Sequence, residues 1–81
     1  MQIVWDEPKR RANISKHEID FADLDEAFFA SAVIRPAKGN RLAAFGWLNG
    51  PVAVVFLPLG REGLSIVSAR PASRKERKLI Q

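Results

Sequence analysis

The pattern of hydrophobic and polar positions at the start of the chain predicts a short strand followed by two helices. The strand covers residues 2–5, and Asp6 can cap a first helix over residues 7–17. The second helix is expected over residues 20–30, because Asp20 can cap it and its apolar positions recur at helical spacing. These apolar positions are Phe21, Leu24, Ala27 and Phe28.

After these helices, the pattern changes to that of strands separated by turns. A strand over residues 52–57 is apolar throughout, which is typical of a central strand covered on both faces. Asn49 and Gly50 predict a tight hairpin turn, because both of its central positions need a positive φ. The other strands are expected over residues 32–35, 41–48 and 64–70.

A last helix is expected over residues 73–80, because Ser73 and Glu76 have the spacing of a capping box. The element order is then β-α-α-β-β-β-β-α, which predicts an α+β fold with helices packed on one antiparallel sheet. The chain is short enough to form one small domain, residues 1–81. The residues expected to form its core are Phe21, Leu24, Phe28, Phe45, Val54, Phe56 and Ile66.

Composition limits the chemistry that this chain can perform. It has no cysteine and one histidine, which excludes disulfides, cysteine nucleophiles and a histidine-rich metal site. We expect no metal, because carboxylates and the histidine do not occur together at ligand spacing, and no other cofactor. No apolar run approaches the about 20 residues of a membrane helix, and the chain turns acidic at Asp6. Neither a membrane segment nor a signal peptide is expected.

The net charge of +4 lies entirely at the end of the chain. Residues 70–81 hold five basic residues against Glu76 alone. Clustered cations raise the local potential, so this asymmetry indicates a phosphate-rich or acidic partner. The alternative is a solvated terminal helix.

Two further groups of polar residues stand out on the predicted helices. The first helix carries a polar face where a small domain is expected to place core residues. Four acidic residues near the start of the second helix are explained by the helix dipole, with a catalytic carboxylate pair as the alternative. The polar face is Lys9, Asn13, Lys16 and His17, and the acidic group is Asp20, Asp23, Asp25 and Glu26.

Two stretches of the chain carry motif residues in a characteristic order. The first is Trp5-Asp6 followed by Lys9, Asn13, Lys16-His17, Phe21, Ala27 and Phe29. The second covers residues 68–77, Ser-Ala-Arg-Pro-Ala-Ser-Arg-Lys-Glu-Arg. Together they resemble the BrnT family, the ribonuclease toxins of type II toxin–antitoxin pairs, which have a RelE-like fold.

The resemblance implies a metal-independent endoribonuclease that cleaves RNA and inhibits translation in the cytoplasm. It also implies a tight complex with a BrnA-like ribbon-helix-helix antitoxin, through which DNA would be bound only indirectly. A thin domain with Trp5, Trp47 and five phenylalanines is expected to expose an apolar patch that such a partner covers.

The chemistry of RNA cleavage selects the candidate site residues. The 2′-hydroxyl must lose a proton, the 5′-oxygen must gain one, and the charge on the phosphorus centre must be stabilised. Trp5 is the candidate for stacking on a base. His17 is the candidate for proton transfer, because histidine is the side chain suited to this near neutral pH. The candidate cations are Lys16, Arg61, Arg70, Arg74 and Arg77.

Each candidate also has a structural interpretation, and a second function stays open. Trp5 can belong to the core, His17 can end a helix, Arg61 can be solvated and Arg70 can pair with Glu76. Three positions depart from the family's pattern: Glu18 replaces a usual glycine, Ser65 replaces a frequent arginine, and Ile80 stands near a usual tyrosine. The alternative function is a catalytically impaired toxin homologue that acts as an antitoxin- or RNA-binding module.

Overall fold

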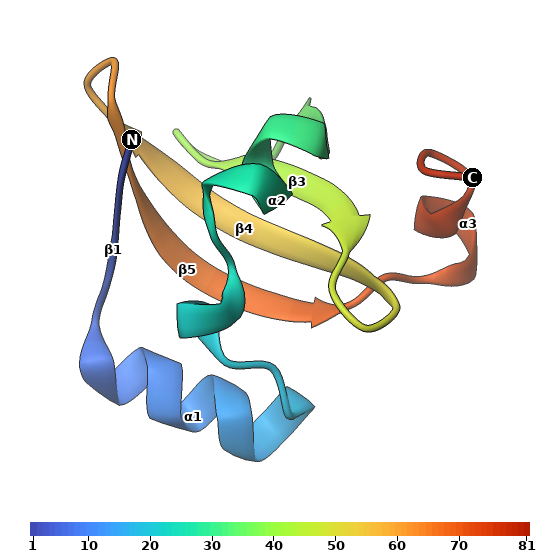
Figure 1. Cartoon of the computed structure of the whole chain (residues 1–81), viewed down its shortest axis with the longest axis horizontal. Coiled ribbons are helices and arrows are strands. Elements are labelled where there is room, and N and C mark those ends of the chain that lie inside the picture. Colours follow the sequence, from blue (N-terminus) through green and yellow to red (C-terminus); the bar gives the residue numbers. More distant parts are fainter.

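The computed structural model describes residues 1–81 as one five-stranded sheet with helices packed against it (Figure 1). In chain order the elements are β1 (Gln2–Trp5), α1 (Glu7–His17), the 3-10 turn η1 (Phe21–Asp23), α2 (Glu26–Ser31), β2 (Val33–Pro36), β3 (Leu42–Trp47), β4 (Pro51–Leu59), β5 (Gly63–Pro71) and α3 (Arg74–Arg77). The predicted α+β class and the predicted order of elements are confirmed.

The strand order across the sheet is β1-β5-β4-β3-β2, so β4 is the central strand, as predicted. Strands β2 to β5 are antiparallel neighbours, but β1 pairs with β5 in parallel. The sheet is therefore mixed rather than wholly antiparallel. The direction of β1 could not be predicted, because the pattern of a four-residue strand carries no information on its neighbour.

The second predicted helix is divided into two pieces. Asp20 caps η1 by accepting from the Ala22 amide, and Asp25 caps α2 by accepting from the Phe28 amide. Between them Leu24 is extended and buries its side chain. Each aspartate accepts a hydrogen bond from a nearby backbone amide, and these local bonds compete with the backbone hydrogen bonds of one continuous helix. The last helix, α3, is also shorter than predicted. After it, turns with hydrogen bonds between residues three apart continue to Ile80.

The core lies on both faces of the sheet, and all seven predicted core residues are buried. The main cluster fills the space between the sheet and the η1–α2 segment. A smaller cluster of Ala43, Phe45 and Ala53 lies on the opposite face, where Ile80 packs against it. The chain after β5 therefore covers part of the second face.

Asn13 explains the polar face of α1. This helix runs alongside β5, and β1 pairs only with residues 63–66 of that strand. Beyond β1, the Asn13 side chain accepts a hydrogen bond from the Ala69 amide at 3.0 Å. It also donates to the Ile19 carbonyl at 2.9 Å. The buried asparagine thus completes the edge of β5 where no strand is available.

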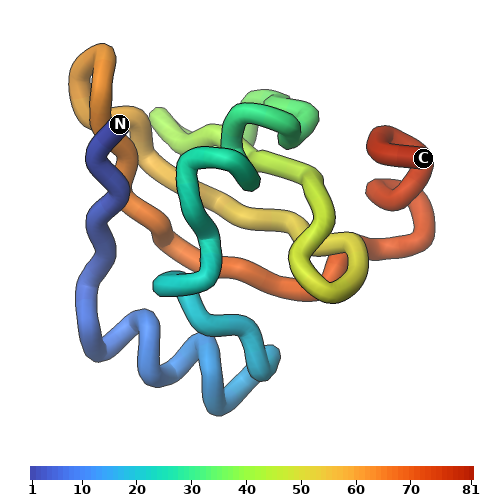
Figure 2. The backbone as a smooth tube through the Cα atoms, in the orientation of Figure 1, coloured from blue at the N-terminus to red at the C-terminus, as the bar shows by residue number.

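The two ends of the chain lie at opposite ends of the sheet (Figure 2). The amide of Gln2 donates to the Glu62 carbonyl at 2.7 Å, which holds the first strand beside the β4–β5 turn. The last residues lie at the other end, next to α3. None of the three helices has the length and apolar character that crossing a membrane requires.

Candidate functional site

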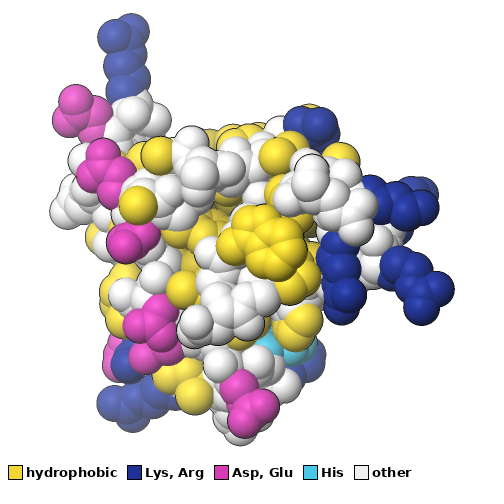
Figure 3. All heavy atoms as spheres, turned by 45° about the vertical axis from the view of Figure 1, so that its right-hand side comes forward, with side chains coloured by type: hydrophobic (Ala, Val, Ile, Leu, Met, Phe, Trp, Pro, Cys, Tyr) yellow, Lys and Arg dark blue, Asp and Glu magenta, His cyan; other side chains and the backbone are white.

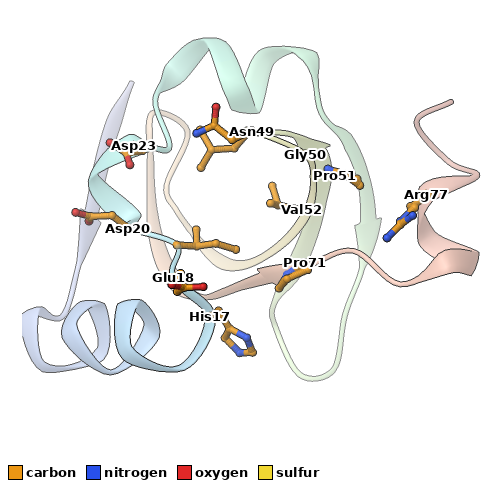
Figure 4. A pocket seen from close by; sticks show the side chains of 12 residues that line it. His17, Glu18, Asp20, Asp23, Asn49, Gly50, Pro51, Val52, Pro71 and Arg77 are labelled. Carbon is orange, nitrogen blue, oxygen red and sulfur yellow. The ribbon is translucent and has the colours of Figure 1, made fainter.

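A hollow of about 320 Å³ opens between the end of α1, η1, the β3–β4 turn and α3 (Figure 4). Its floor is apolar and includes Ile19 and Val52, and its rim is polar and charged. The lining residues are His17, Glu18, Ile19, Asp20, Asp23, Leu48, Asn49, Gly50, Pro51, Val52, Pro71 and Arg77. Its volume is at the lower end of the range of ligand sites, and its lining is more polar than that of most small-molecule pockets.

His17 reaches the hollow because α1 ends at this residue. Glu18 adopts a left-handed conformation with φ of 58°, and its amide donates to the Ile14 carbonyl at 2.8 Å, which closes the helix. His17 is half-buried and also lines a second, smaller hollow with Lys9, Lys16 and Ser68. The single histidine therefore lines both hollows, with Lys16 beside it in the chain.

Arg77 lines the same hollow from the opposite side. It lies on α3, and its guanidinium points from the helix toward the hollow (Figure 4). The helix starts with the predicted capping box, in which Ser73 accepts from the Glu76 amide and Glu76 accepts from the Ser73 amide. The structure thus brings together His17 and Arg77, two candidates that are far apart in the sequence.

The basic segment, residues 74–78, presents four cations at this end of the sheet. The side chains of Arg74, Lys75, Arg77 and Lys78 are exposed, and none of them takes part in a salt bridge. Basic side chains project together from one side of the molecular surface (Figure 3). Such a surface attracts polyanions, because no neighbouring carboxylate neutralises these charges.

Arg70 is the one candidate cation that forms a salt bridge within the protein. Its guanidinium donates to both carboxylate oxygens of Glu76, at 2.7 and 2.9 Å. This hydrogen bonding raises the pKa of Arg70 and lowers the pKa of Glu76 to about 2. The geometry therefore shows Arg70 paired with Glu76, the structural alternative to a phosphate-binding role.

The acidic group serves mainly the ends of helices. Arg10 donates to both oxygens of Asp20, at 2.7 and 3.0 Å, and with the Ala22 amide it holds the pKa of Asp20 below its ordinary value. Asp25 caps α2. The helix-end interpretation is thus confirmed for these two aspartates. Asp23 and Glu18 also line the hollow, and neither forms a salt bridge.

Trp5 and Arg61 lie away from the hollow. The Trp5 side chain packs against the main core, and its Nε1 donates to a carboxylate oxygen of Glu7 at 3.1 Å. Arg61 is exposed in the β4–β5 turn, at the opposite end of the sheet from α3 (Figure 1). The structure therefore does not group these two candidates with His17 and Arg77.

Two residues at this end of the sheet were not among the candidate site residues predicted from the sequence. Asn49 lines the hollow from the predicted hairpin turn. Trp47 ends β3, is 60 % exposed and donates from Nε1 to the Ile80 carbonyl at 3.3 Å. The alternation of β3 puts Trp47 on the face of Phe45, but the partner of its ring nitrogen depends on how the distant C-terminus folds.

Comparisons with known proteins agree on one family. The family model of the ribonuclease toxin BrnT, of type II toxin–antitoxin systems, matches residues 5–76. The fold is similar to a 1.1 Å crystal structure of the Brucella abortus ribonuclease toxin BrnT, with 53 % identity and a TM-score of 0.84. This similarity covers 91 % of the present chain and 99 % of the Brucella chain. The search of curated proteins finds no match.

Proposed function

The chain belongs to the BrnT family of ribonuclease toxins of type II toxin–antitoxin systems. We propose that it cuts RNA internally, with the ribose 2′-hydroxyl of the RNA itself as the attacking group. The observation that carries this proposal is that His17 and Arg77 line one hollow. A proton-transfer group and a cation at one place are what this reaction requires.

The reaction uses groups that are already in the RNA. The 2′-hydroxyl loses its proton, and its oxygen attacks the adjacent phosphorus. The bond from phosphorus to the 5′-oxygen breaks, and that oxygen takes up a proton. The products are a 2′,3′-cyclic phosphate and a 5′-hydroxyl end. His17 carries one of the two proton transfers, and Arg77 stabilises the charge on the phosphoryl oxygens with help from Arg74 and Lys16.

We propose that this reaction needs no metal ion. Arginine and lysine side chains supply the positive charge that a metal would otherwise provide. His17, Glu18, Asp20 and Asp23 all line the hollow, but no three of them are placed so that they could hold a metal ion. Asp20 is in addition paired with Arg10.

We also propose that cleavage inhibits translation in the cytoplasm and that a ribbon-helix-helix antitoxin neutralises the chain. Support for a partner comes from the exposed apolar residues Met1, Val4 and Leu59, which surround a hollow of about 320 Å³ at the edge strand β1. An open strand edge beside apolar surface is a surface that partners cover. In this complex the antitoxin, rather than this chain, contacts DNA.

The test is an RNA cleavage assay in the presence of EDTA. The wild-type chain should cut RNA, leave 2′,3′-cyclic phosphate ends and spare DNA of the same sequence. His17→Ala should lower the rate by about 100-fold or more, the usual contribution of a proton-transfer group. Ser15→Ala is the matched control, because Ser15 is exposed on the same helix and outside the hollow.

Each outcome of this assay decides a separate point. Intact RNA with the wild-type chain, together with normal growth on its expression, would support the impaired homologue that only binds. Cutting that stops with EDTA and resumes with a divalent cation would refute metal independence. Unchanged cutting by His17→Ala would remove His17 from the site.

A further inference from the structure

We propose that Trp47 is a stacking platform for one base of single-stranded RNA, beside the basic segment 74–78. The proposal rests on the ribonuclease function proposed above and specifies how the substrate is held. Among the large hydrophobic side chains that remain exposed, Trp47 has the highest exposed fraction, 60 %. A large flat side chain open to solvent at one end of a sheet is suited to stacking on a nucleobase.

The indole is held in place although it is exposed. Its Nε1 donates to the Ile80 carbonyl at 3.3 Å, and Ile80 packs against the smaller core cluster. On the backbone side, Trp47 is paired with Pro51 at the closed end of the β3–β4 hairpin. The ring's one polar group is thus satisfied within the protein, and what remains exposed is apolar ring surface. A held ring loses little conformational freedom when a base stacks on it.

The charge around Trp47 favours a polyanion over an apolar protein segment. Ile80, the hydrogen-bond partner of the ring, is two residues beyond Lys78, the last cation of the basic segment. The only carboxylate of the segment, Glu76, is occupied by Arg70. Figure 3 shows a large hydrophobic side chain exposed at the surface next to a group of basic side chains. Single-stranded nucleic acids are bound by this combination of aromatic surface and cations along the backbone.

The location also connects the platform to the proposed cleavage site. Trp47 pairs with Pro51 and precedes Leu48, and both of these residues line the hollow with His17 and Arg77. The Trp47 ring itself lies on the face of Phe45, so a base on it belongs to a nucleotide around the end of the sheet from the one whose phosphate lies at the hollow. Trp5 is a contrast, because it packs against the main core at the other end of the molecule.

The test measures binding of a fluorescent 2′-O-methyl oligoribonucleotide, which lacks the free 2′-hydroxyl needed for cutting. Trp47→Ala should weaken binding by about 5- to 150-fold, the range expected on loss of one base–aromatic stack. Trp47→Phe, which keeps a flat ring, should bind more tightly than Trp47→Leu, which keeps only apolar volume. This pair remains informative if the alanine variant fails to fold. Ile34→Ala is the control, because Ile34 is an exposed apolar residue on the edge strand β2.

An oligonucleotide with abasic sites isolates the stack itself. Trp47→Ala should have no effect on its binding, since no base is present to stack.

The proposal is wrong if the wild-type chain cuts RNA but Trp47→Ala binds the normal oligonucleotide as tightly as the wild type does. It is also wrong if Trp47→Ala binds RNA normally but is no longer neutralised by the antitoxin, since Trp47 would then contact the antitoxin rather than RNA. Binding that depends on Trp47 in a chain that cuts nothing would support the platform and refute the ribonuclease function. A chain that binds no RNA would refute both.

Discussion

Arg70 donates two hydrogen bonds from its guanidinium to the carboxylate of Glu76, at 2.7 and 2.9 Å. The same carboxylate accepts from the Ser73 amide at 2.8 Å. One side chain therefore joins the end of β5, the start of α3 and the capping box. This ion pair, together with the Trp47–Ile80 hydrogen bond, connects the basic segment to the sheet.

The ion pair predicts a loss of stability in acid. The pKa of Glu76 is about 2 in the folded chain against an ordinary value of 4.5, so the folded state favours the ionised carboxylate. This stabilisation is complete above the ordinary value and is lost as the pH falls from 4.5 toward 2. We expect the pair to contribute about 1 kcal/mol to the free energy of unfolding, because solvent screens the half-exposed Arg70.

Urea unfolding at a series of pH values measures this contribution. Glu76→Gln is the control, because glutamine can keep the capping-box hydrogen bond but has no charge. Asp20 also has a lowered pKa and titrates in both proteins, so only the difference between wild type and variant reports on Glu76. Identical pH dependence in the two proteins would show that the ion pair contributes nothing.

The elements that the sequence predicted well depend on local signals. Asn49 and Gly50 have positive φ, 53° and 128°, as predicted, but the turn is one residue longer than a two-residue hairpin, because Trp47 pairs with Pro51. The capping box of Ser73 and Glu76 is present, and the apolar run 52–57 lies in the central strand. Each of these features is determined by a few neighbouring residues, so the pattern alone contains it.

The site was harder to predict, because it depends on contacts between distant parts of the chain. His17 and Arg77 line one hollow only because α1 ends, and α3 lies, at the same end of the sheet. The exposure of Trp47 depends on the path of residues 78–81, and the engagement of Arg70 depends on where α3 lies. Residue type suggested seven candidates, and only the folded arrangement separates Trp5 and Arg61 from the others.

Asn13→Ala is expected to destabilise the fold by about 2–3 kcal/mol, since it leaves the buried Ala69 amide and the Ile19 carbonyl without their partner. Ser15→Ala, an exposed change in the same helix, serves as the control. Thermal or urea unfolding followed by circular dichroism measures both. Equal stability of the two variants would mean that water replaces the asparagine without loss.

Glu18→Gly is expected to stabilise the fold by about 0.5–1 kcal/mol. Glu18 has φ of 58°, a left-handed conformation that glycine adopts without strain. The glycine that the family resemblance implies at this position would therefore relieve backbone strain, so we expect the departure to affect stability. Glu18→Gln removes the charge but keeps the strain, so it should unfold at the wild-type urea concentration. A gain in Glu18→Gln equal to that in Glu18→Gly would attribute the effect to charge.

Replacing Arg74 and Arg77 together by alanine should abolish RNA cleavage and leave the fold intact. Both side chains are exposed and form no salt bridge, and alanine is a strong helix former, so unfolding should be almost unchanged. Each phosphate contact that is lost should reduce the salt dependence of RNA binding by about 0.7, the value for single strands. Lys38→Ala with Arg41→Ala is the matched control, because it removes the same charge from the β2–β3 turn. If both double variants lower cleavage equally, net charge and not the position of the arginines governs RNA binding. If the Arg74 and Arg77 variant cuts RNA normally, the segment is a solvated surface, and the phosphate contacts must come from another cation such as Lys16.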